Sequence, residues 1–448
     1  MYTLPDGQRV VLPATQDFTM KEFFTTLIMS LAVLITALLP PSSWAEQTSR
    51  PNQSLLKPAD KAPAPLTALM QSASRGHPSL RQAQARLDAA RANLRGADKA
   101  LYNPELELAS ENTDVRTTTI QLSQTIDWSD QRGARTAVAQ SEFNQASAEL
   151  EQAELDLIQN QLNTLADHLT RMKLANVSEQ RLGLMQDFVK VAQRRYQAGD
   201  LNQVELNLAR LAYSEALMGH AQVVTEATSA MQQLVTYFGP LATRLAKVPE
   251  SLPTPRVPAD LDTYLTNLPE MRAHTAGITA LRQSVTLRTR EKSWDPTIAI
   301  RAGEEGKQDL IGASISVPLN IRNTYQANVD VAQQELIQKQ QSAGLAFRQL
   351  RARVITNTER FRLLQQAWGQ WQTAGKSHVD QQLVLLKRLW QAGDISTTDY
   401  LVQLNQALDT QASGIELRGQ FWNSGFDWLH DTASIKSWLN LNSTNLKN

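Results

Sequence analysis

A short run of residues occurs twice in the chain and constrains its fold more than any other feature. The run reads Tyr-Gln-Ala-Gly-Asp-Leu over residues 196–201 and Trp-Gln-Ala-Gly-Asp-Ile over residues 390–395, at an offset of 390 − 196 = 194. Each copy separates two long polar–apolar helical patterns. Glycine takes the left-handed conformation that ends a helix at little cost, and Asp can cap a following helix. We therefore predict that each copy forms the tip of a helical hairpin.

The duplication extends well beyond the two tips. Residues 103–106 match 295–298, residues 123–127 match 316–320, and residues 77–80 match 268–271, at offsets of 192, 193 and 191. Landmarks that keep their order at a nearly constant offset indicate an internal repeat. Each half is predicted to consist of a helix, two strands, a very long helix, a tip and a return helix. The predicted first repeat spans 66–240, a Pro-rich linker 241–258 and the second repeat 259–430.

The start of the chain has the pattern of a secretory signal over residues 20–45. Lys21 precedes an apolar run from Phe23 to Leu39, and Ser43-Trp44-Ala45 forms a small-x-small cleavage site before Glu46. A transmembrane anchor is the alternative, because the run is nearly long enough to span a bilayer. The signal predicts an exported protein that begins near Glu46. Residues 46–65 are predicted to be an extended arm, and residues 431–448 a polar, loose C-terminal tail.

Composition and motifs exclude several classes of function. Basic and acidic residues both number 44, so no bulk charge favours nucleic acid as a partner. The chain has no cysteine, which excludes disulfides, thiolate metal sites and an N-terminal lipidated Cys. Catalytic signatures such as GxSxG, a P-loop, HExxH and CxxC are absent, and the six histidines are scattered. We predict no enzymatic activity, no cofactor, no catalytic residues and no metal site.

Four segments show a two-residue alternation of apolar and polar side chains, which is typical of strands with one apolar face. They lie within residues 104–111, 118–127, 298–303 and 311–317. Together with its flanking residues, each is expected to form a strand of about 8–10 residues, the length that a tilted strand needs to cross a bilayer. Opposite these apolar positions, Gln121, Ser123, Gly312 and Ser314 are expected to line a lumen. The residues expected to face lipid are Ile120, Leu122, Ile311, Ala313 and Ile315.

Four strands per chain cannot close a barrel, and open strand edges are not tolerated in lipid. If the strands lie in a membrane, several chains must share one barrel. The alternative is two ordinary hairpins in a periplasmic sheet, and the residues by themselves leave both open.

The longest predicted helix runs from about residue 133 to 197 and would be roughly 100 Å long. Its apolar residues follow seven-residue seams of coiled-coil type, as in Ala139, Phe143, Ala146, Leu150, Ala153 and Leu157. The second half repeats this pattern in what we predict is one continuous helix through Leu350, Val354, Asn357, Phe361, Leu364, Trp368 and Trp371. The fold class predicted is mainly α, with long coiled-coil helices and a small β part.

An exported, duplicated chain with two strands and a very long helix per half resembles the TolC family of outer-membrane efflux channels over residues 66–430. The segments 103–106, 123–124 and 196–200 are similar to the CzcC-like branch, which serves heavy-metal exporters of the resistance-nodulation-division (RND) type. The resemblance implies a homotrimer with a shared 12-stranded transmembrane β-barrel in the outer membrane and a 12-helix α-barrel in the periplasm. It also implies two partners, a periplasmic membrane-fusion adaptor protein and an inner-membrane RND pump.

The function that this resemblance implies is a passive trimeric exit duct for heavy-metal cations. Two alternatives within the channel class are drug efflux and type I protein secretion. An alternative of another class is a periplasmic coiled-coil scaffold or adaptor without a pore. The scaffold predicts protein in the periplasmic fraction, whereas the channel predicts outer-membrane material that requires detergent.

The resemblance also gives the tips a role as a gate and as the docking rim for the adaptor. In a trimer, Asp200 and Asp394 would form a ring of six carboxylates, and neighbouring arginines would pair with them. A simpler role for the two aspartates, compatible with the first, is helix capping. The residues predicted to form the tip site are Arg194, Arg195, Tyr196, Ala198, Gly199, Asp200, Leu201, Arg388, Trp390, Ala392, Gly393, Asp394 and Ile395.

Overall fold

The computed structural model describes residues 55–57 and 60–441, which lie in one unit spanning Ser54–Asn448. The predicted signal peptide at 20–45 lies outside the described residues. So do most of the predicted N-terminal arm and residues 442–448 of the predicted tail.

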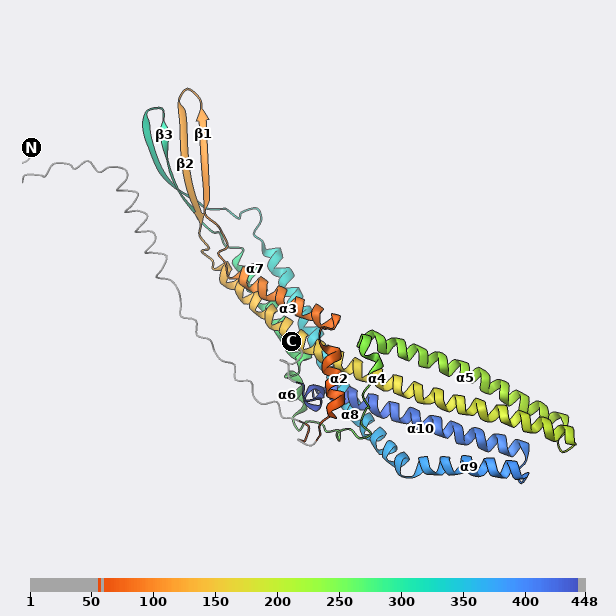
Figure 1. Ribbon diagram of the computed structural model, residues 1–448. Helices are drawn as coiled ribbons and strands as arrows, with labels where there is room; N and C mark the ends of the chain where they lie inside the picture. The colour runs from red at the N-terminus through yellow and green to blue at the C-terminus, as the bar shows by residue number, and fades with distance from the viewer. Residues whose placement is uncertain (1–54, 58–59, 442–448) are drawn as a thin grey trace, which may run out of the picture. The chain divides into compact units, whose positions relative to one another are not determined.

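Both halves of the unit contain the same series of elements, which confirms the internal duplication (Figure 1). The first half comprises α2 (Ala64–Ser74), α3 (Pro78–Ala97), β1 (Glu105–Asn112), β2 (Arg116–Thr125), α4 (Gln131–Ala198), α5 (Gln203–Phe238) and the 3-10 turn η1 (Gly239–Thr243). The second comprises α6 (Leu261–Thr266), α7 (Pro269–Arg290), β3 (Thr297–Glu305), β4 (Gln308–Ser316), α8 (Gln326–Gln370), the π-helical turn η2 (Trp371–Gly375), α9 (Lys376–Ala392), α10 (Thr397–Asp431) and α11 (Ile435–Trp438).

Helix α4 has 68 residues and agrees closely with the predicted span. Its first free N–H groups are bound by side chains, because Asp127 accepts from Gln131 N at 2.7 Å and Asp130 accepts from Gly133 N at 3.1 Å. Such caps satisfy donors that have no partner within the helix. The helix contains no proline and ends only at Gly199. These local signals explain why one uninterrupted helix forms here.

The strands form one antiparallel sheet in the order β1-β2-β3-β4. The strand boundaries lie close to the predicted segments. The central pairing of β2 with β3 joins the two repeats, with Leu122 opposite Ile300 and Ile120 opposite Ala302. Within the described residues, β1 and β4 each pair on one side only, so each presents a free edge.

The helices form a wall that continues from the sheet to the tips (Figure 1). Near the sheet, α4 packs against α3 and α7, and α7 packs against α8. Toward the tips, α4 packs against α5 and α10, and α10 packs against α9. The described chain therefore has one series of edge elements, β1, α3 and α5, and a second series, β4, α8 and α9.

The largest core lies where α2, α4, α8 and α10 meet the linker between the halves. The linker is held by tryptophans, since Trp422 Nε1 donates to Pro249 O at 2.9 Å and Trp368 Nε1 donates to Glu250 O at 3.3 Å. These bonds satisfy indole N–H groups within an apolar cluster. The proline-rich segment is thus a packed part of the core.

The predicted loose tail is wrong for its described part, residues 431–441. Its apolar residues Ile435, Trp438, Leu439 and Leu441 are buried in the same core. Lys436 also forms an ion pair with the buried Glu154 of α4. The polar residues between the apolar ones make the composition of this segment typical of a solvent-exposed tail. Burial of one indole and three aliphatic side chains nevertheless outweighs the entropic cost of ordering the segment.

The predicted long helix of the second half continues from α8 into α9 through a π-helical turn at Trp371–Gly375, a local bulge that the sequence pattern does not predict. The Trp371 ring lies directly over two glycines. A Cβ at Gly375 would come within 2.3 Å of Trp371 Cε3, and one at Gly414 within 2.2 Å of Trp371 Cζ2. A π turn accommodates one extra residue, and here it places the ring against α10.

Replacement of Trp438 by Ala should destabilise the protein by roughly 3–5 kcal/mol, because a fully buried indole leaves a cavity. Thermal unfolding of the detergent-solubilised protein, followed by circular dichroism, measures this loss. The exposed neighbour Ser437 supplies the control, since Ser437→Ala should change stability by less than about 0.5 kcal/mol. Equal stability of the two variants would show that the tail does not contribute to the core.

Candidate functional site

The two tips have nearly identical backbone geometry. Gly199 has φ 82° and ψ 8°, and Gly393 has φ 83° and ψ 11°. At the first tip, Asp200 N donates to Arg195 O at 2.9 Å and Gly199 N donates to Tyr196 O at 3.1 Å. The second tip has the equivalent bonds, to Leu389 O and Trp390 O. This is the Schellman arrangement, in which a left-handed residue, usually glycine, closes the helix.

The structure contradicts the predicted capping role of the two aspartates. The residue that caps α5 is Asn202, whose side chain accepts from Glu205 N at 2.9 Å, while Glu205 accepts from Asn202 N at 3.0 Å. The residue that caps α10 is Ser396, which accepts from Asp399 N at 3.1 Å. The return helices begin at Gln203 and Thr397, and in both tips the cap is the residue two positions after the aspartate. Asp200 and Asp394 are consequently exposed and unused as caps.

The tip arginines do not pair with these aspartates within the described chain, and pairing between neighbouring copies in a trimer stays a prediction. Arg194 and Arg388 are exposed and form no ion pair among residues 55–57 and 60–441. Arg195 instead crosses to the other tip, where its guanidinium lies 4.7 Å from the centre of the Trp390 ring. Its Nη2 also donates to Trp390 O at 3.2 Å. An arginine over an indole face is favourable because the ring face is electronegative.

Behind the tips, an aromatic cluster joins the two helical hairpins. Phe188 of α4, Trp390 of α9 and Tyr400 of α10 contact one another with ring centres 4.9–5.4 Å apart. They belong to a buried cluster that also contains Leu206 of α5, so all four tip helices share this core. We had predicted only Trp390 of these as a tip residue. Phe188 and Tyr400 had no motif to mark them beyond the apolar seam of their helices.

The remaining predicted tip residues divide into two groups. Leu201 and Ile395 are half-buried and pack on the aromatic cluster. Tyr196, Ala198 and Ala392 are exposed, and Tyr196 retains 40% of its accessible surface. The outermost part of each tip is therefore a small surface with a glycine, an alanine and an unpaired carboxylate.

The sheet has one continuous apolar face. Direct cross-strand partners share a face of an antiparallel sheet. The register places Leu106 opposite Leu122, and Ile300 opposite both Leu122 and Ala313. The next row along this face contains Leu108, Ile120, Ala302 and Ile311. All five strand residues predicted to contact lipid lie on this face and are exposed, although contact with lipid itself stays a prediction.

The opposite face of the sheet is polar. Its rows contain Glu107, Gln121, Arg301 and Gly312, and next to them Glu105, Ser123, Ala299 and Ser314. Gln121 Nε2 donates to Glu107 Oε2 across the strands at 3.3 Å. The predicted lumen residues are thus together on one face, opposite the apolar one.

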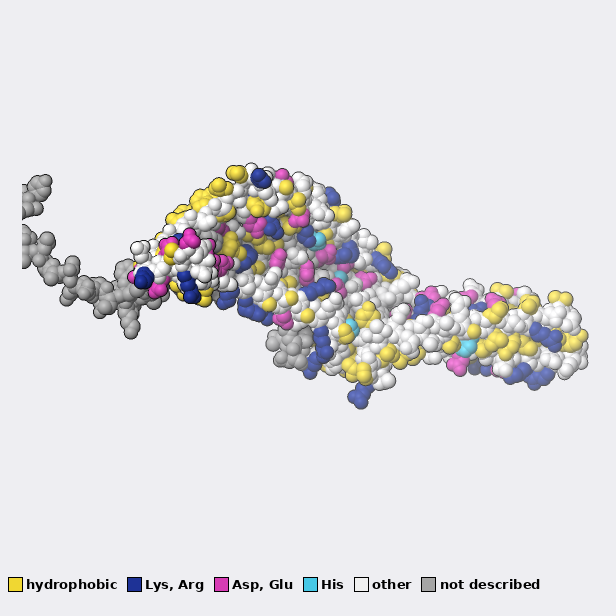
Figure 2. Space-filling view, turned by 90° about the horizontal axis from the view of Figure 1, so that it is seen from above, with side chains coloured by type: hydrophobic (Ala, Val, Ile, Leu, Met, Phe, Trp, Pro, Cys, Tyr) yellow, Lys and Arg dark blue, Asp and Glu magenta, His cyan; other side chains and the backbone are white. Residues whose placement is uncertain are grey.

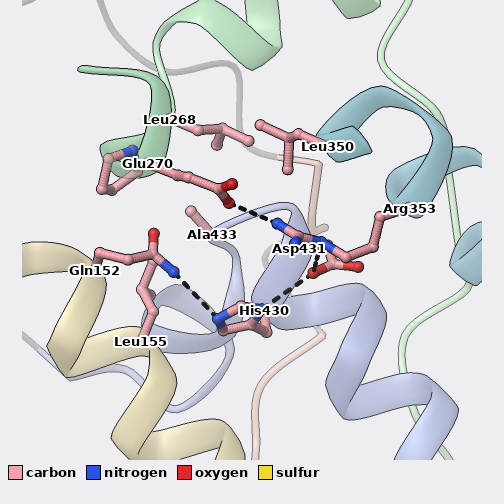
Figure 3. A pocket seen from close by; sticks show the side chains of 10 residues that line it. Gln152, Leu155, Leu268, Glu270, Leu350, Arg353, His430, Asp431 and Ala433 are labelled. Carbon is pink, nitrogen blue, oxygen red and sulfur yellow. Dashed lines mark hydrogen bonds and ion pairs between the residues drawn. The ribbon is translucent and has the colours of Figure 1, made fainter. Parts of the chain in front are cut away.

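A cluster of charges, with Asp431 buried and His430 nearly so, joins four helices around His430 (Figure 3). His430 Nε2 lies 2.8 Å from Asp156 Oδ1 of α4, and its Nδ1 lies 3.1 Å from Asp431 Oδ1. Arg353 of α8 binds the same Asp431 oxygen at 3.1 Å and donates to Glu270 Oε2 of α7 at 2.5 Å. The sequence did not reveal this cluster, because its members are far apart in the chain and follow no motif spacing.

The charges of the cluster stabilise one another. Burial by itself lowers the pKa of His430, but hydrogen bonds to Asp156 and Asp431 and their negative charges outweigh it and raise the pKa to about 9. The imidazole is therefore positively charged at neutral pH. Burial raises the pKa of Asp156, yet hydrogen bonds from His430 and Gln152 outweigh it and hold this pKa below its usual range. Buried charges persist only when they are paired in this way.

Two observations concern metals and membrane helices. Among the described residues, no group of three or more His, Cys, Asp or Glu is placed to hold a metal ion. In the same part of the chain, no helix is both long and apolar enough to span a membrane.

Comparison with known proteins agrees with this architecture. Residues 69–240, the greater part of the first repeat, match the family model described as Outer membrane efflux protein. No curated protein sequence matches the chain. The outer membrane channel CmeC of Campylobacter jejuni superimposes with a TM-score of 0.71 at 13% identity, covering 91% of this chain and 98% of CmeC.

Two further channel structures have the same fold. CusC, described in the context of transmembrane channel formation, superimposes with a TM-score of 0.68 at 15% identity, covering 88% of this chain and 99% of CusC. The outer membrane protein VceC of Vibrio cholerae gives 0.66 at 18% identity, covering 82% of this chain and 96% of VceC. The predicted fold class is confirmed by these likenesses.

Substitution of Gly199 by Val should destabilise the tip by roughly 1–2 kcal/mol, because a Cβ disfavours the left-handed conformation. Space is not limiting, since no atom lies within 4 Å of a Cβ at this position. Gly183, within α4, also has nothing within 4 Å but is helical, so Gly183→Val is a matched control that should change stability little. Thermal unfolding compares the two. Equal stability would contradict the need for glycine at the tip.

The protonated His430 should make stability depend on pH. Its folded-state pKa is raised, so the stabilisation is fully present below about pH 6.5 and is lost as pH rises through about 9. The loss should be on the order of 3 kcal/mol, and His430→Gln should abolish this part of the pH dependence. Thermal midpoints between pH 7 and 10 test it, with His378→Gln on exposed α9 as the control. Parallel pH profiles for wild type and His430→Gln would contradict the assignment.

Proposed function

We propose that this chain is the outer-membrane channel of a tripartite efflux system of the RND type, a passive exit duct that extends into the periplasm. The observation that carries the proposal is the sheet with one exposed apolar face, one polar face and two unpaired edges, placed at one end of a wall of long helices. The match of residues 69–240 to the Outer membrane efflux protein model and the channel fold support it.

The free edges support an assembly in which identical chains close a ring. One side of the chain presents β1, α3 and α5, and the other presents β4, α8 and α9. Unlike edges that meet head to tail generate a closed ring when the rotation closes. Ring closure pairs β4 of one copy with β1 of the next and removes every open strand edge, which lipid requires. Three copies with four strands each give a shared 12-stranded β-barrel, wide enough for an aqueous lumen.

The tips are the proposed gate and the docking rim for a periplasmic membrane-fusion adaptor protein, which would connect the duct to an inner-membrane RND pump. The support is their exposure and their unpaired charges. In a trimer the six tips bring together exposed Asp200 and Asp394 with exposed Arg194 and Arg388 from neighbouring copies. Since these groups have no ion-pair partner within the described chain, they are free to bind one another or an adaptor.

We further propose that the cargo is a heavy-metal cation. The support is the similarity of segments 103–106, 123–124 and 196–200 to the CzcC-like branch. Drug efflux and type I secretion are the competing cargo classes. The test expresses this protein in a strain that lacks its own channel. Restored resistance to metal salts indicates metal cargo, and restored resistance to drugs indicates drug cargo.

The test of the channel uses two neighbouring residues that point to opposite faces of β4. Solubilised wild type should have a mass of roughly 135 kDa, three mature chains scaled from the full 49.9 kDa chain. It should also conduct ions in planar bilayers. Ile315→Arg places a charge on the apolar face at a cost of roughly 2–4 kcal/mol and should abolish trimers. Ser314→Arg should keep the trimer and change its conductance.

Three results would contradict the channel. One is a monomer that does not insert into bilayers, which would favour a scaffold without a pore. Another is periplasmic protein that needs no detergent. The last is equal tolerance of Ile315→Arg and Ser314→Arg, which would show that the two faces of the sheet have been assigned wrongly.

A further inference from the structure

The apolar alternation of the sheet continues past the ends of its strands. Strand β4 ends at Ser316, yet apolar residues continue at two-residue spacing through Val317, Leu319 and Ile321. Leu319 is 76% exposed and Ile321 is 82% exposed, at least as much as Ile315 within the strand at 72%. Isolated exposed apolar residues need no explanation, but a continuous exposed run indicates a contact surface.

Aromatic residues stand at the same end of the other three strands. Trp128 follows β2 and is 72% exposed, and Trp294 precedes β3 and is 49% exposed. Tyr102 precedes β1. The buried carboxylate of Asp295 gathers them, because it accepts from Tyr102 Oη at 2.9 Å and from Trp128 N at 3.1 Å, and it adjoins Trp294 in the chain. We call Tyr102, Trp128 and Trp294 the aromatic belt.

The other end of the apolar face is polar. On this face, the row beyond Leu108 and Ile311 contains Ser110, Thr118, Glu304 and Asp309. Figure 2 shows hydrophobic side chains gathered at the end of the unit that carries the sheet, beside a group of charged side chains. The apolar band is therefore bounded by charged rows at the hairpin turns and by the aromatic belt near the helices.

The length of the band decides how much of the chain it must include. Membrane barrels expose an apolar band about 25 Å tall, with strands tilted by about 40°. From Ile311 to Ile315 is four residue steps, or roughly 13 Å along the strand, which is too short. From Ile311 to Ile321 is ten steps, which is at most roughly 33 Å because residues 317–321 lie beyond the strand, and its projection at that tilt is close to 25 Å. From Ile120 to Trp128 is eight steps, or at most roughly 26 Å, which projects to about 20 Å.

We infer that the helix-proximal border of the lipid-contacting surface lies outside the strands, in the aromatic belt and in linker residues Leu319 and Ile321. The inference rests on the proposed channel function, and it assigns the headgroup region of a phospholipid bilayer as the occupant. Tryptophan and tyrosine favour this region because their rings are apolar at one end and polar at the other.

A second copy of the chain is the competing occupant. The linker after β4 follows an edge strand, so a neighbouring copy could cover Leu319 and Ile321. Trp128 and Trp294, however, adjoin the central strands β2 and β3, which a neighbour paired along β1 or β4 does not reach. The belt is continuous across edge and central strands, which favours lipid.

The absence of cysteine permits a direct test with single-Cys variants of the full chain. Leu319→Cys and Ile321→Cys would be labelled with bimane and reconstituted into phosphatidylethanolamine–phosphatidylglycerol vesicles. These vesicles would carry a nitroxide either on the headgroup or deep in the acyl chain. Ile315→Cys, near the middle of the band, and Val204→Cys, exposed near the tip, are the controls.

Labels at 319 and 321 should be quenched by the headgroup nitroxide about twofold or more over the deep one, and the label at 315 in the reverse order. The label at 204 should respond to neither. If 315 is quenched while 319 and 321 are not, the border is wrong and another copy covers the linker. Stronger quenching of 319 and 321 by the deep nitroxide would also overturn the border. If 315 is not quenched either, the proposed membrane location itself fails.

Discussion

The packing of helix α4 is the constraint on which the rest of the structure depends. Its 68 residues contact α3 and α7 near the sheet, and α5 and α10 near the tips. The backbone hydrogen bonds of the helix are made within the helix itself. Only the packing of its side chains against neighbouring helices fixes its position, and it therefore buries apolar seams on more than one side. The buried Leu155, Ile158 and Leu162 occupy the stretch where the two sets of neighbours meet. Loss of packing there would separate the sheet end from the tip end.

The two repeats have the same backbone conformation at their tips but make different side-chain contacts. Both tips close with a left-handed glycine, with φ angles of 82° and 83°. The interactions around them differ, since Arg195 of the first tip lies on Trp390 of the second. The π-helical turn with Trp371 also has no counterpart in the described part of the first half. Duplication therefore supplies two matching hairpins. Residues that differ between the copies, such as Arg195 and Trp390, form the contacts that bind one hairpin to the other.

Two polar centres connect the parts of the wall. Asp295 binds the segments on either side of the sheet at its junction with the helices, and His430 with Asp431 joins four helices further along. The carboxylates of Asp295 and Asp431 are buried, and each has several partners, as buried charge requires. Such centres specify one geometry, because any displacement leaves a charge without its partners.

The sequence by itself determined the features that depend on neighbours in the chain. Two-residue alternation located the strands and their faces, and glycine located both tips, because strand pleat and positive φ are local properties. The structure alone decided which side chains meet. Asn202 and Ser396 cap the return helices in place of the aspartates. Arg195 binds an indole and not a carboxylate. Trp438 is buried, and it packs the described part of the tail into the largest core. The pairing of β2 with β3 and the charges around His430 join residues more than a hundred positions apart. Such contacts depend on three-dimensional packing, and a single sequence contains no local signal for them.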